Sequence, residues 1–361
     1  MTDDKEQLAA AFGTDTDPLA SHEATFETAG VDPFEPFRTD VLKSAVAPRT
    51  RSNYDTLWRQ WCEHMSRVGR HPACPSVEHV RGFARHELET KGNQPRTVAE
   101  KLRKLTQVYR YWQQSPVFPH STGFDPIRLA RMGLDLSAGE RKSPPPIPLA
   151  DLREVVDSIT HLRDHAIVVC QLKLGLRATE LCNLQLAEVN LDEPLLKEEY
   201  PELGTHDWLS GRPNAVYIPH DREGNKSRRP RVLPIDTELQ SVLTEYLLVR
   251  PTVDKPWVFL SKTSHSHLRK KAINTVWKNT FHPAYAETER YRAVTSHYGR
   301  HRFSTYWRVE QDLTRELVQY LRGDTPGATK IEELGALDEY LHTYYEDIEE
   351  TYRERMYSIL P

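Results

Sequence analysis

The sequence is poor in cysteine and has no long apolar run. Its four cysteines are scattered, with no Cys-x-x-Cys pair, which excludes a disulfide framework and a cysteine-rich zinc site. No stretch approaches the roughly 20 apolar residues that cross a bilayer, and the polar, acidic start shows no signal pattern. Glycine-rich loops that cradle nucleotide phosphates are also absent. These absences predict a cytoplasmic protein with no membrane partner, no metal and no nucleotide cofactor.

Charge is distributed unevenly along the chain, although the net charge is only −4. Residues 1–37 hold nine acidic residues and one lysine, whereas residues 38–145 hold nineteen basic and ten acidic residues. Of these two regions, only residues 38–145 suit a polyanionic partner such as nucleic acid. The alternative is that their surplus positive charge belongs to an ordinary solvated surface.

The length of 361 residues suits two domains, each with its own core. The proline-rich segment 142–148 predicts a linker between them, because consecutive prolines cannot continue a helix. We therefore expect a helical domain over residues 38–141 and a second domain with a C-terminal tail over residues 149–361. Residues 1–37 are acidic and lack periodicity, so they are expected to form a largely disordered or loosely docked arm.

Residues 38–141 show the periodicity of amphipathic helices. The clearest helix opens at Thr97, and its apolar stripe comprises Val98, Leu102, Leu105, Tyr109 and Trp112. Lys101 and Lys104 lie off this stripe, and Arg51 begins an earlier helix. These basic side chains either keep the helices soluble or, as the surplus charge favours, contact phosphates without reading a base sequence.

The second domain mixes helical and strand patterns. Helices are predicted near residues 149–159, 166–174, 237–249, 267–281, 296–307 and 313–321. Two segments rich in β-branched residues, 215–219 and 231–235, flank a turn-prone stretch and predict a β-hairpin. The expected fold class is mainly α with a small antiparallel β-sheet.

An arginine stands at the start of a predicted helix in the segment Gly175-Leu-Arg-Ala-Thr-Glu-Leu181. Gly175 permits a tight turn, which would place Arg177 at the helix start with Glu180 one turn further on. Because apolar residues flank the motif, Arg177 is expected to be partly buried. The two charged residues form either a structural ion pair or a site prepared for an anion.

The stretch 295–307 carries the densest cluster of chemically active side chains. Ser296 is expected to cap a helix whose apolar residues Phe303 and Trp307 lie away from its polar face. The polar face comprises His297, Arg300, His301 and Ser304. A metal at this face is disfavoured because the arginine between the two histidines would repel a cation. A phosphate fits better, since arginine and histidine both donate to anionic oxygens.

Two further stretches complete the candidate set. The turn between the two strands is basic and is expected to be mobile; it holds Lys226, Arg228 and Arg229. In the C-terminal tail, Tyr344 and Tyr345 belong to an apolar helical stripe. Tyr340 lies off that stripe and is freer to act.

This ordered set resembles the tyrosine recombinase (phage integrase) family. The matching pieces are Gly-Leu-Arg-x-x-Glu-Leu around Arg177, Gly-Asn-Lys ending at Lys226, His-x-x-Arg-His at 297–301 and Tyr-x-His at 340–342. Residues 50–54, Thr-Arg-Ser-Asn-Tyr, also resemble the opening of that family's core-binding domain. The resemblance covers about residues 40–350. It implies a helical core-binding domain followed by an α+β catalytic domain.

The resemblance implies a site-specific recombinase that cuts and rejoins double-stranded DNA through a 3′-phosphotyrosine. Tyr340 would attack the phosphorus, while Arg177 and Arg300 would clamp its non-bridging oxygens. His297 would donate to the phosphate or assist the phenol, and Lys226 would protonate the leaving 5′-hydroxyl. The family also implies a homo-tetramer on two recombination sites of a mobile element, with DNA-bending accessory proteins as further partners. No cofactor is needed, because the phosphotyrosine conserves the bond energy.

The sequence departs from the family pattern at three places. Asp324 stands where the family usually carries a histidine, or sometimes a tryptophan. An ionised carboxylate cannot make the same donation, and Arg322 stays open as its substitute. The gap from Asp324 to Tyr340 is longer than usual, which keeps Tyr344 and Tyr345 open as nucleophiles. The hairpin turn is also longer, and an alignment could place Glu223 at the lysine position. Two alternative functions stay open: a catalytically degenerate DNA-binding relative that regulates a mobile element, and a type IB topoisomerase-like relaxer.

Overall fold

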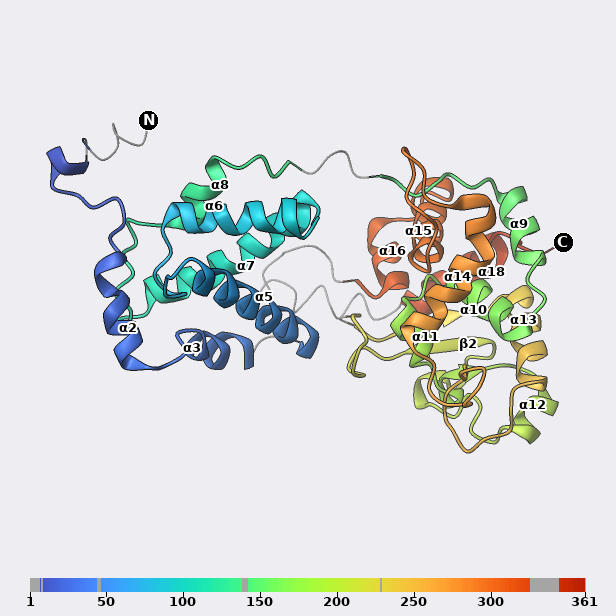
Figure 1. The fold of residues 1–361 in the computed structure, drawn as a ribbon. Coiled ribbons are helices and arrows are strands. Elements are labelled where there is room, and N and C mark those ends of the chain that lie inside the picture. Colours follow the sequence, from blue (N-terminus) through green and yellow to red (C-terminus); the bar gives the residue numbers. More distant parts are fainter. Residues whose placement is uncertain are drawn as a thin grey trace. The chain divides into compact units, whose positions relative to one another are not determined.

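The computed structural model describes residues 7, 9–43, 47–137, 142–227, 229–324 and 344–360. The chain divides into two units, residues 1–141 and 142–361 (Figure 1). Within the described ranges, no helix is both long and apolar enough to cross a membrane.

The first unit consists of helices around an aromatic core. Its main helices are α5 (Pro48–Arg67), α6 (Val77–Arg85), α7 (Pro95–Gln114) and α8 (Pro126–Met132). The helix expected from Thr97 is α7, and all five residues of its predicted stripe are buried. Ser76 caps α6, because its hydroxyl accepts from the backbone N–H of His79. The periodicity of this region therefore gave the helices and their buried faces correctly.

Residues 1–37 were expected to form a largely disordered or loosely docked arm, but their described part contains helices. These are α2 (Glu23–Ala29) and α3 (Glu35–Phe37), and a π-helix (Arg38–Leu42) follows them. Phe34 and Phe37 are buried in the core of the first unit, and Phe34 stacks on Trp58 with ring centroids 5.0 Å apart. Acidic composition suggested disorder here, but two phenylalanines bury enough apolar surface to anchor the segment.

The second unit is mainly helical with one small sheet, which confirms the expected fold class. Its longer helices are α9 (Leu149–Asp157), α10 (Leu162–Leu174), α13 (Thr237–Leu248), α14 (Lys270–Tyr285), α15 (His297–Thr305), α16 (Arg315–Arg322) and α18 (Tyr344–Arg355). Strands β2 (Ala215–Ile218) and β3 (Arg231–Pro234) form the predicted antiparallel hairpin. A two-residue strand, β1 (Val189–Asn190), pairs with β2 on its other side and was not expected.

Helix α10 lies at the centre of the second unit, packed against α13 and α15 (Figure 1). Its residues from Ala166 to Leu174 are all buried, and they include a lysine. Lys173 donates from Nζ to Oδ2 of Asp236 at 2.5 Å and to the carbonyl oxygen of Tyr357 at 3.0 Å. The hydroxyl of Tyr352 in turn donates to the carbonyl oxygen of Lys173 at 2.6 Å. The C-terminal segment 344–360 is therefore bound directly to α10.

The proline-rich segment 142–148 lies against the second unit. The carbonyl oxygen of Ser143 accepts from the backbone N–H of Arg292 at 3.1 Å, and Lys142 pairs with Glu287 at 2.7 Å. Ile147 is buried in the core of this unit. The segment leads into α9, which begins immediately after Pro148.

Candidate active site

The loop that carries Arg177 is set by a close approach of α10 and α15. Helix α10 ends at Gly175, whose φ of 62° is left-handed. A Cβ at this position would lie 2.5 Å from Cδ1 of Phe303 on α15, so both the backbone and the contact require glycine. Helix α11 (Ala178–Cys182) follows, with Arg177 as its N-cap residue. The predicted turn and helix start are confirmed.

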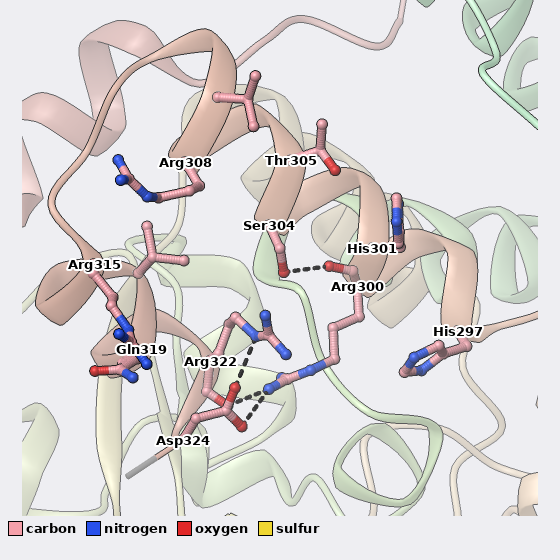
Figure 2. A pocket seen from close by; sticks show the side chains of 12 residues that line it. His297, Arg300, His301, Ser304, Thr305, Arg308, Arg315, Gln319, Arg322 and Asp324 are labelled. Atoms are coloured by element: carbon pink, nitrogen blue, oxygen red, sulfur yellow. Dashed lines mark hydrogen bonds and ion pairs between the residues drawn. The ribbon is translucent and has the colours of Figure 1, made fainter. Parts of the chain in front are cut away.

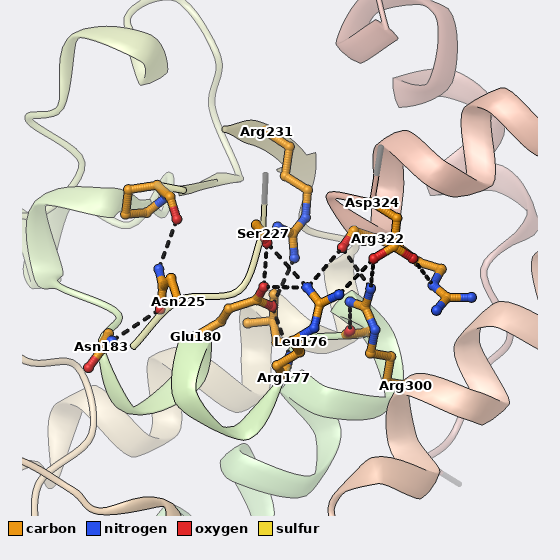
Figure 3. Close-up of polar contacts among 12 residues, drawn as sticks. Leu176, Arg177, Glu180, Asn183, Asn225, Ser227, Arg231, Arg300, Arg322 and Asp324 are labelled. Atoms are coloured by element: carbon orange, nitrogen blue, oxygen red, sulfur yellow. Dashed lines mark hydrogen bonds and ion pairs between the residues drawn. The ribbon is translucent and has the colours of Figure 1, made fainter. Parts of the chain in front are cut away.

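Glu180 orients Arg177 from one turn along α11. The backbone N–H of Arg177 donates to Oε2 of Glu180 at 2.8 Å, and its Nη1 donates to Oε1 at 3.0 Å. The Ser227 hydroxyl and Nη2 of Arg231 donate to the same carboxylate, at 2.5 Å and 3.0 Å (Figure 3). Burial alone would raise the pKa of Glu180, but its partners, Arg231 foremost, lower it to about 2. Glu180 therefore stays ionised and fixes the direction of Arg177.

Arg300 reaches the same place from α15. Its side chain is only 2% exposed; Nη1 donates to the carbonyl oxygen of Gly175 at 2.9 Å and Nη2 to that of Arg322 at 2.8 Å. Helix α15 can approach α10 because a Cβ on Gly299 would lie 3.0 Å from Gln171. Burial and the neighbouring charge of Arg177 lower the pKa of Arg300 to about 9. A guanidinium held this way retains its charge at neutral pH and favours an anionic partner.

Asp324 supplies that anion in the structure. Its Oδ1 accepts from Nη2 of Arg177 at 2.6 Å and from Nη2 of Arg300 at 3.0 Å (Figure 3). Its Oδ2 lies 2.9 Å from Nε of Arg322. Asp324 follows Gly323, whose φ of 62° ends α16 and turns the chain back towards the arginines. Two arginines far apart in the sequence therefore converge on one carboxylate oxygen.

The polar face of α15 lines a pocket of about 550 Å³. Its lining includes four arginines and two histidines (Arg300, Arg308, Arg315, Arg322, His297 and His301) and one acid, Asp324 (Figure 2). Partial loss of water around the ring, together with Arg292 and Arg300, lowers the pKa of His297. At neutral pH the ring can therefore carry a single proton, as a donor or an acceptor.

The N-terminus of α15 agrees with the prediction in its position but not in its capping. The helix begins directly after Ser296, as expected, but the Ser296 hydroxyl donates to Oδ1 of Asn274 and makes no capping bond. Phe303 and Trp307 are fully buried on the other side, so the two faces are separated as the sequence predicts. At the start of the helix the backbone N–H of Tyr298 donates instead to the carbonyl oxygen of Thr295, at 2.7 Å.

The turn that carries Lys226 is held in place, which differs from the expected mobility. Nδ2 of Asn183 donates to the carbonyl oxygen of Glu223 and to Oδ1 of Asn225, each at 3.0 Å. Arg222 anchors the start of the turn on Glu188, with Nη1 2.9 Å from Oε2. Lys226 itself is exposed. Arg229 lies in the same turn, whereas Arg228 lies outside the described residues.

Tyr340, the predicted nucleophile, lies outside the described residues, and so does the side chain of Tyr344. Tyr345 is described: it is 4% exposed, and its hydroxyl donates to Oε1 of Glu349 at 3.0 Å. Burial and Glu349 raise the pKa of Tyr345, which opposes formation of a phenolate. In this conformation Tyr345 is a core residue, as its place on the apolar stripe predicts.

A family model described as the phage integrase family matches residues 149–323. The second unit therefore contains a domain of this family. Tyrosine recombinase XerA from Pyrococcus horikoshii is 27% identical over 199 residues, covering 53% of this chain and 59% of that protein. Tyrosine recombinase XerC from Thermodesulfovibrio yellowstonii is 26% identical over 176 residues, or 47% of either chain. The chain thus spans about half the length of the curated relatives it matches.

Solved integrase structures share the fold of this chain. The Tn1549 transposon integrase in complex with transposon right end DNA has a TM-score of 0.60 at 15% identity, covering 86% of this chain and 98% of that chain. A lambda integrase dimer bound to a COC′ core site has a TM-score of 0.56 at 10% identity, covering 90% and 78%. At these identities the likeness concerns the fold alone.

The basic residues of the first unit that were expected to contact phosphates differ in their surroundings. Lys101 donates from Nζ to Oε2 of Glu87 at 2.5 Å, and that carboxylate is completely buried. Its role in the structure is therefore to neutralise a core acid. Lys104 instead stands 5.4 Å above the ring of Tyr54 and lines a surface pocket with Arg103 and Arg110. Arg51 is partly exposed on α5.

Sequence reasoning missed two residues of the site. Arg231 was assigned to a strand, and Ser227 was not noticed, yet both bind Glu180. The carbonyl oxygen of Arg322 accepts from Arg300. An arginine within the otherwise apolar strand segment 231–235 was the one available signal, because a buried charge needs a partner.

Proposed function

We propose that this phage integrase family protein cuts and rejoins double-stranded DNA through a covalent phosphotyrosine. The observation that carries the proposal is the convergence of Arg177 and Arg300 on one anionic oxygen. Charge develops on the non-bridging oxygens during phosphoryl transfer, and fixed guanidiniums in a partly buried site stabilise it without reorganising. The family membership and the recombinase relatives support the same reaction.

In this proposal Arg177 and Arg300 bind the scissile phosphate from opposite sides, and Glu180 positions Arg177. His297 stands beside Arg300 on the pocket wall, where its ring can donate to a phosphate oxygen or accept the proton of the attacking phenol. Lys226 protonates the departing 5′-oxygen from the turn that Asn183 holds in place. Because both its ends are anchored, this turn can present the exposed ammonium to DNA at little cost in ordering.

Tyr340 is the proposed nucleophile. Its hydroxyl oxygen attacks the phosphorus, the bond to the 5′-oxygen breaks, and the leaving oxygen takes a proton. Reversal by a different 5′-hydroxyl then rejoins the strands, so the phosphodiester bond energy is conserved. Tyr345 is a weak alternative because its hydroxyl is buried on Glu349. Tyr344 stays open.

The test recovers DNA that remains attached to the protein in detergent, starting from nicked duplex fragments of the genome that encodes the chain. Mass spectrometry of the trapped adduct then identifies the modified tyrosine. We expect wild type and Tyr345→Phe to form the adduct and Tyr340→Phe to lose it while still retarding DNA. An adduct that persists in Tyr340→Phe and disappears in Tyr344→Phe would move the assignment to Tyr344.

A second candidate function is DNA binding without cleavage. The observation that favours it is Asp324, a carboxylate that fills the anion position between the arginines. A binding-only protein would retard DNA in a salt-sensitive manner and give no adduct in any variant. A topoisomerase-like relaxer would instead relax a random supercoiled plasmid, which a site-specific recombinase leaves supercoiled.

We further propose that the basic surface of the first unit holds the DNA backbone, through Lys104, Arg103 and Arg110, while the second unit carries out the chemistry. Work on two recombination sites implies four copies of the chain, and sedimentation of the protein with a site-containing duplex would measure that number. Recombination that requires added DNA-bending proteins would identify the accessory partners.

A further inference from the structure

We infer that Asp324 is an internal competitor for the phosphate-oxygen position between Arg177 and Arg300. The inference rests on the proposed function, because it assumes that those two guanidiniums bind a DNA phosphate. It adds that the carboxylate occupies the position in the DNA-free protein and leaves when the phosphate enters.

The geometry around Asp324 matches that of an anion-binding site. Its Oδ1 accepts from two guanidiniums at 2.6 and 3.0 Å, and its Oδ2 lies 2.9 Å from a third (Figure 3). Charge-assisted N–H···O bonds to a phosphate oxygen have the same lengths and use the same donors. A carboxylate and a phosphodiester cannot share these donors, because two anionic oxygens in contact repel each other.

Charge balance explains why some anion is needed here. Arg300 is almost fully buried beside Arg177, and burial and that neighbour both lower its pKa. The other nearby acid, Glu180, is already bound by Arg231 and Ser227. Without Asp324 the two guanidiniums would face each other with Glu180 alone to offset them, which is costly in a poorly solvated site.

The arginines remain oriented when the carboxylate leaves. Arg300 keeps its hydrogen bonds to the carbonyl oxygens of Gly175 and Arg322, at 2.9 and 2.8 Å. Arg177 keeps its hydrogen bond to Oε1 of Glu180, at 3.0 Å. Asp324 itself is 27% exposed and lies beyond the end of α16, so its departure breaks no helical hydrogen bond. The clamp is therefore preorganised for a phosphate, and the carboxylate is the group that a phosphate replaces.

The experiment measures binding of inorganic phosphate to the full-length protein by calorimetry, in a phosphate-free buffer. We expect Asp324→Asn, which keeps the shape and removes the charge, to bind phosphate roughly tenfold more tightly than wild type. Its melting temperature should fall in the absence of phosphate and recover when phosphate is added. Asp324→Ser, a smaller neutral side chain, should show the same gain if the asparagine variant folds poorly.

The matched control is Asp192→Asn. Asp192 is 67% exposed and pairs with Lys197 at 3.8 Å, so this variant loses the same charge from the same unit without touching a residue of the arginine pocket. Its phosphate affinity should equal that of wild type. Adding Arg300→Lys to Asp324→Asn should remove the gain, because lysine cannot reproduce the two-nitrogen geometry.

Equal phosphate affinity in wild type and Asp324→Asn, or an equal gain in Asp192→Asn, would overturn the inference. Loss of the DNA adduct in Asp324→Asn would also overturn it, because a group that only competes cannot be required for the chemistry. Failure of the proposed function is a separate result: wild type would form no adduct, while the phosphate titration would still decide whether Asp324 competes.

Discussion

Arg231 donates from Nη2 to Oε2 of Glu180 over 3.0 Å, and both side chains are completely buried. The two residues come from β3 and α11, so this ion pair joins the sheet to the helix that Arg177 caps. Removing one partner would leave an uncompensated charge in the core, whereas the intact pair is satisfied by Ser227 and Arg177 as well. The orientation of Arg177 therefore depends on a buried network that DNA need not touch.

The first prediction concerns the pH dependence of stability. The pKa of Glu180 falls from its ordinary 4.5 to about 2, so its stabilising contribution is complete above pH 4.5 and is lost as the pH falls through 2. A shift of this size corresponds to about 3 kcal/mol. Urea unfolding of wild type between pH 2 and pH 6 should show this loss, and Glu180→Gln should be less stable at neutral pH with a flatter acid profile. Parallel profiles for the two proteins would contradict the assignment.

The second prediction concerns Gly323. A Cβ there would lie 2.4 Å from Nη1 of Arg231 and 2.7 Å from Oγ of Ser227, at a left-handed φ of 62°. Gly323→Ala should therefore cost about 2–4 kcal/mol and reduce adduct formation. Gly211→Ala is the control, because Gly211 has a similar φ of 72° with open space around it, and should cost about 1 kcal/mol. If chemical denaturation gave equal losses of unfolding free energy for the two variants, backbone strain alone would explain the effect of Gly323→Ala.

The third prediction separates two lysines of α7. Lys101→Ala should lower the unfolding free energy by about 1–3 kcal/mol, because Glu87 would keep only Lys91 and Asn93 as partners. Lys104→Ala should leave stability almost unchanged and weaken DNA binding, lowering the slope of affinity against salt by about one unit. Thermal melts and gel retardation at several salt concentrations measure both effects. The reverse pattern would refute the structural role of Lys101.

The fourth prediction concerns the turn that presents Lys226. Asn183→Ala removes both hydrogen bonds that Asn183 donates to the turn, so it should slow adduct formation while DNA affinity stays the same. Asn190→Ala is the matched control, because Nδ2 of Asn190 donates at 2.8 Å to the backbone carbonyl oxygen of Arg212, in a different loop of the same unit. Rates measured on one trapped substrate compare the two variants. An unchanged rate in Asn183→Ala would exclude a positioning role.

Local patterns in the sequence predicted most of the fold. The spacing of apolar residues gave α7 with its buried stripe, and the β-branched segments on either side of the basic turn gave β2 and β3. These features depend on neighbours within one turn or one hairpin, which a sequence displays directly. The same local chemistry placed Gly175 and Arg177 correctly, because a tight turn and a helix start are properties of a few consecutive residues.

Features that depend on distant partners were not accessible in the same way. Nothing near Ser227 or Arg231 in the sequence indicates that both would bind Glu180, because the three residues meet only in the folded second unit. The placement of Phe34 on Trp58 escaped notice for the same reason, since acidic neighbours obscured a long-range contact. Asp324 was recognised as unusual, yet the sequence could not reveal that it would be bound by Arg177 and Arg300 together.

Helix α10 has a further consequence for the design of shortened proteins. Its buried Lys173 pairs with Asp236 and Glu238 and also donates to the carbonyl oxygen of Tyr357. The Tyr357 hydroxyl in turn donates to the carbonyl oxygen of Leu172 at 2.7 Å. Deleting residues 344–360 would therefore expose an ammonium two positions before Gly175, where the arginine loop begins. A truncation intended to dissect the late tyrosines would thus disturb Arg177 as well, so point substitutions are the safer means to assign the nucleophile.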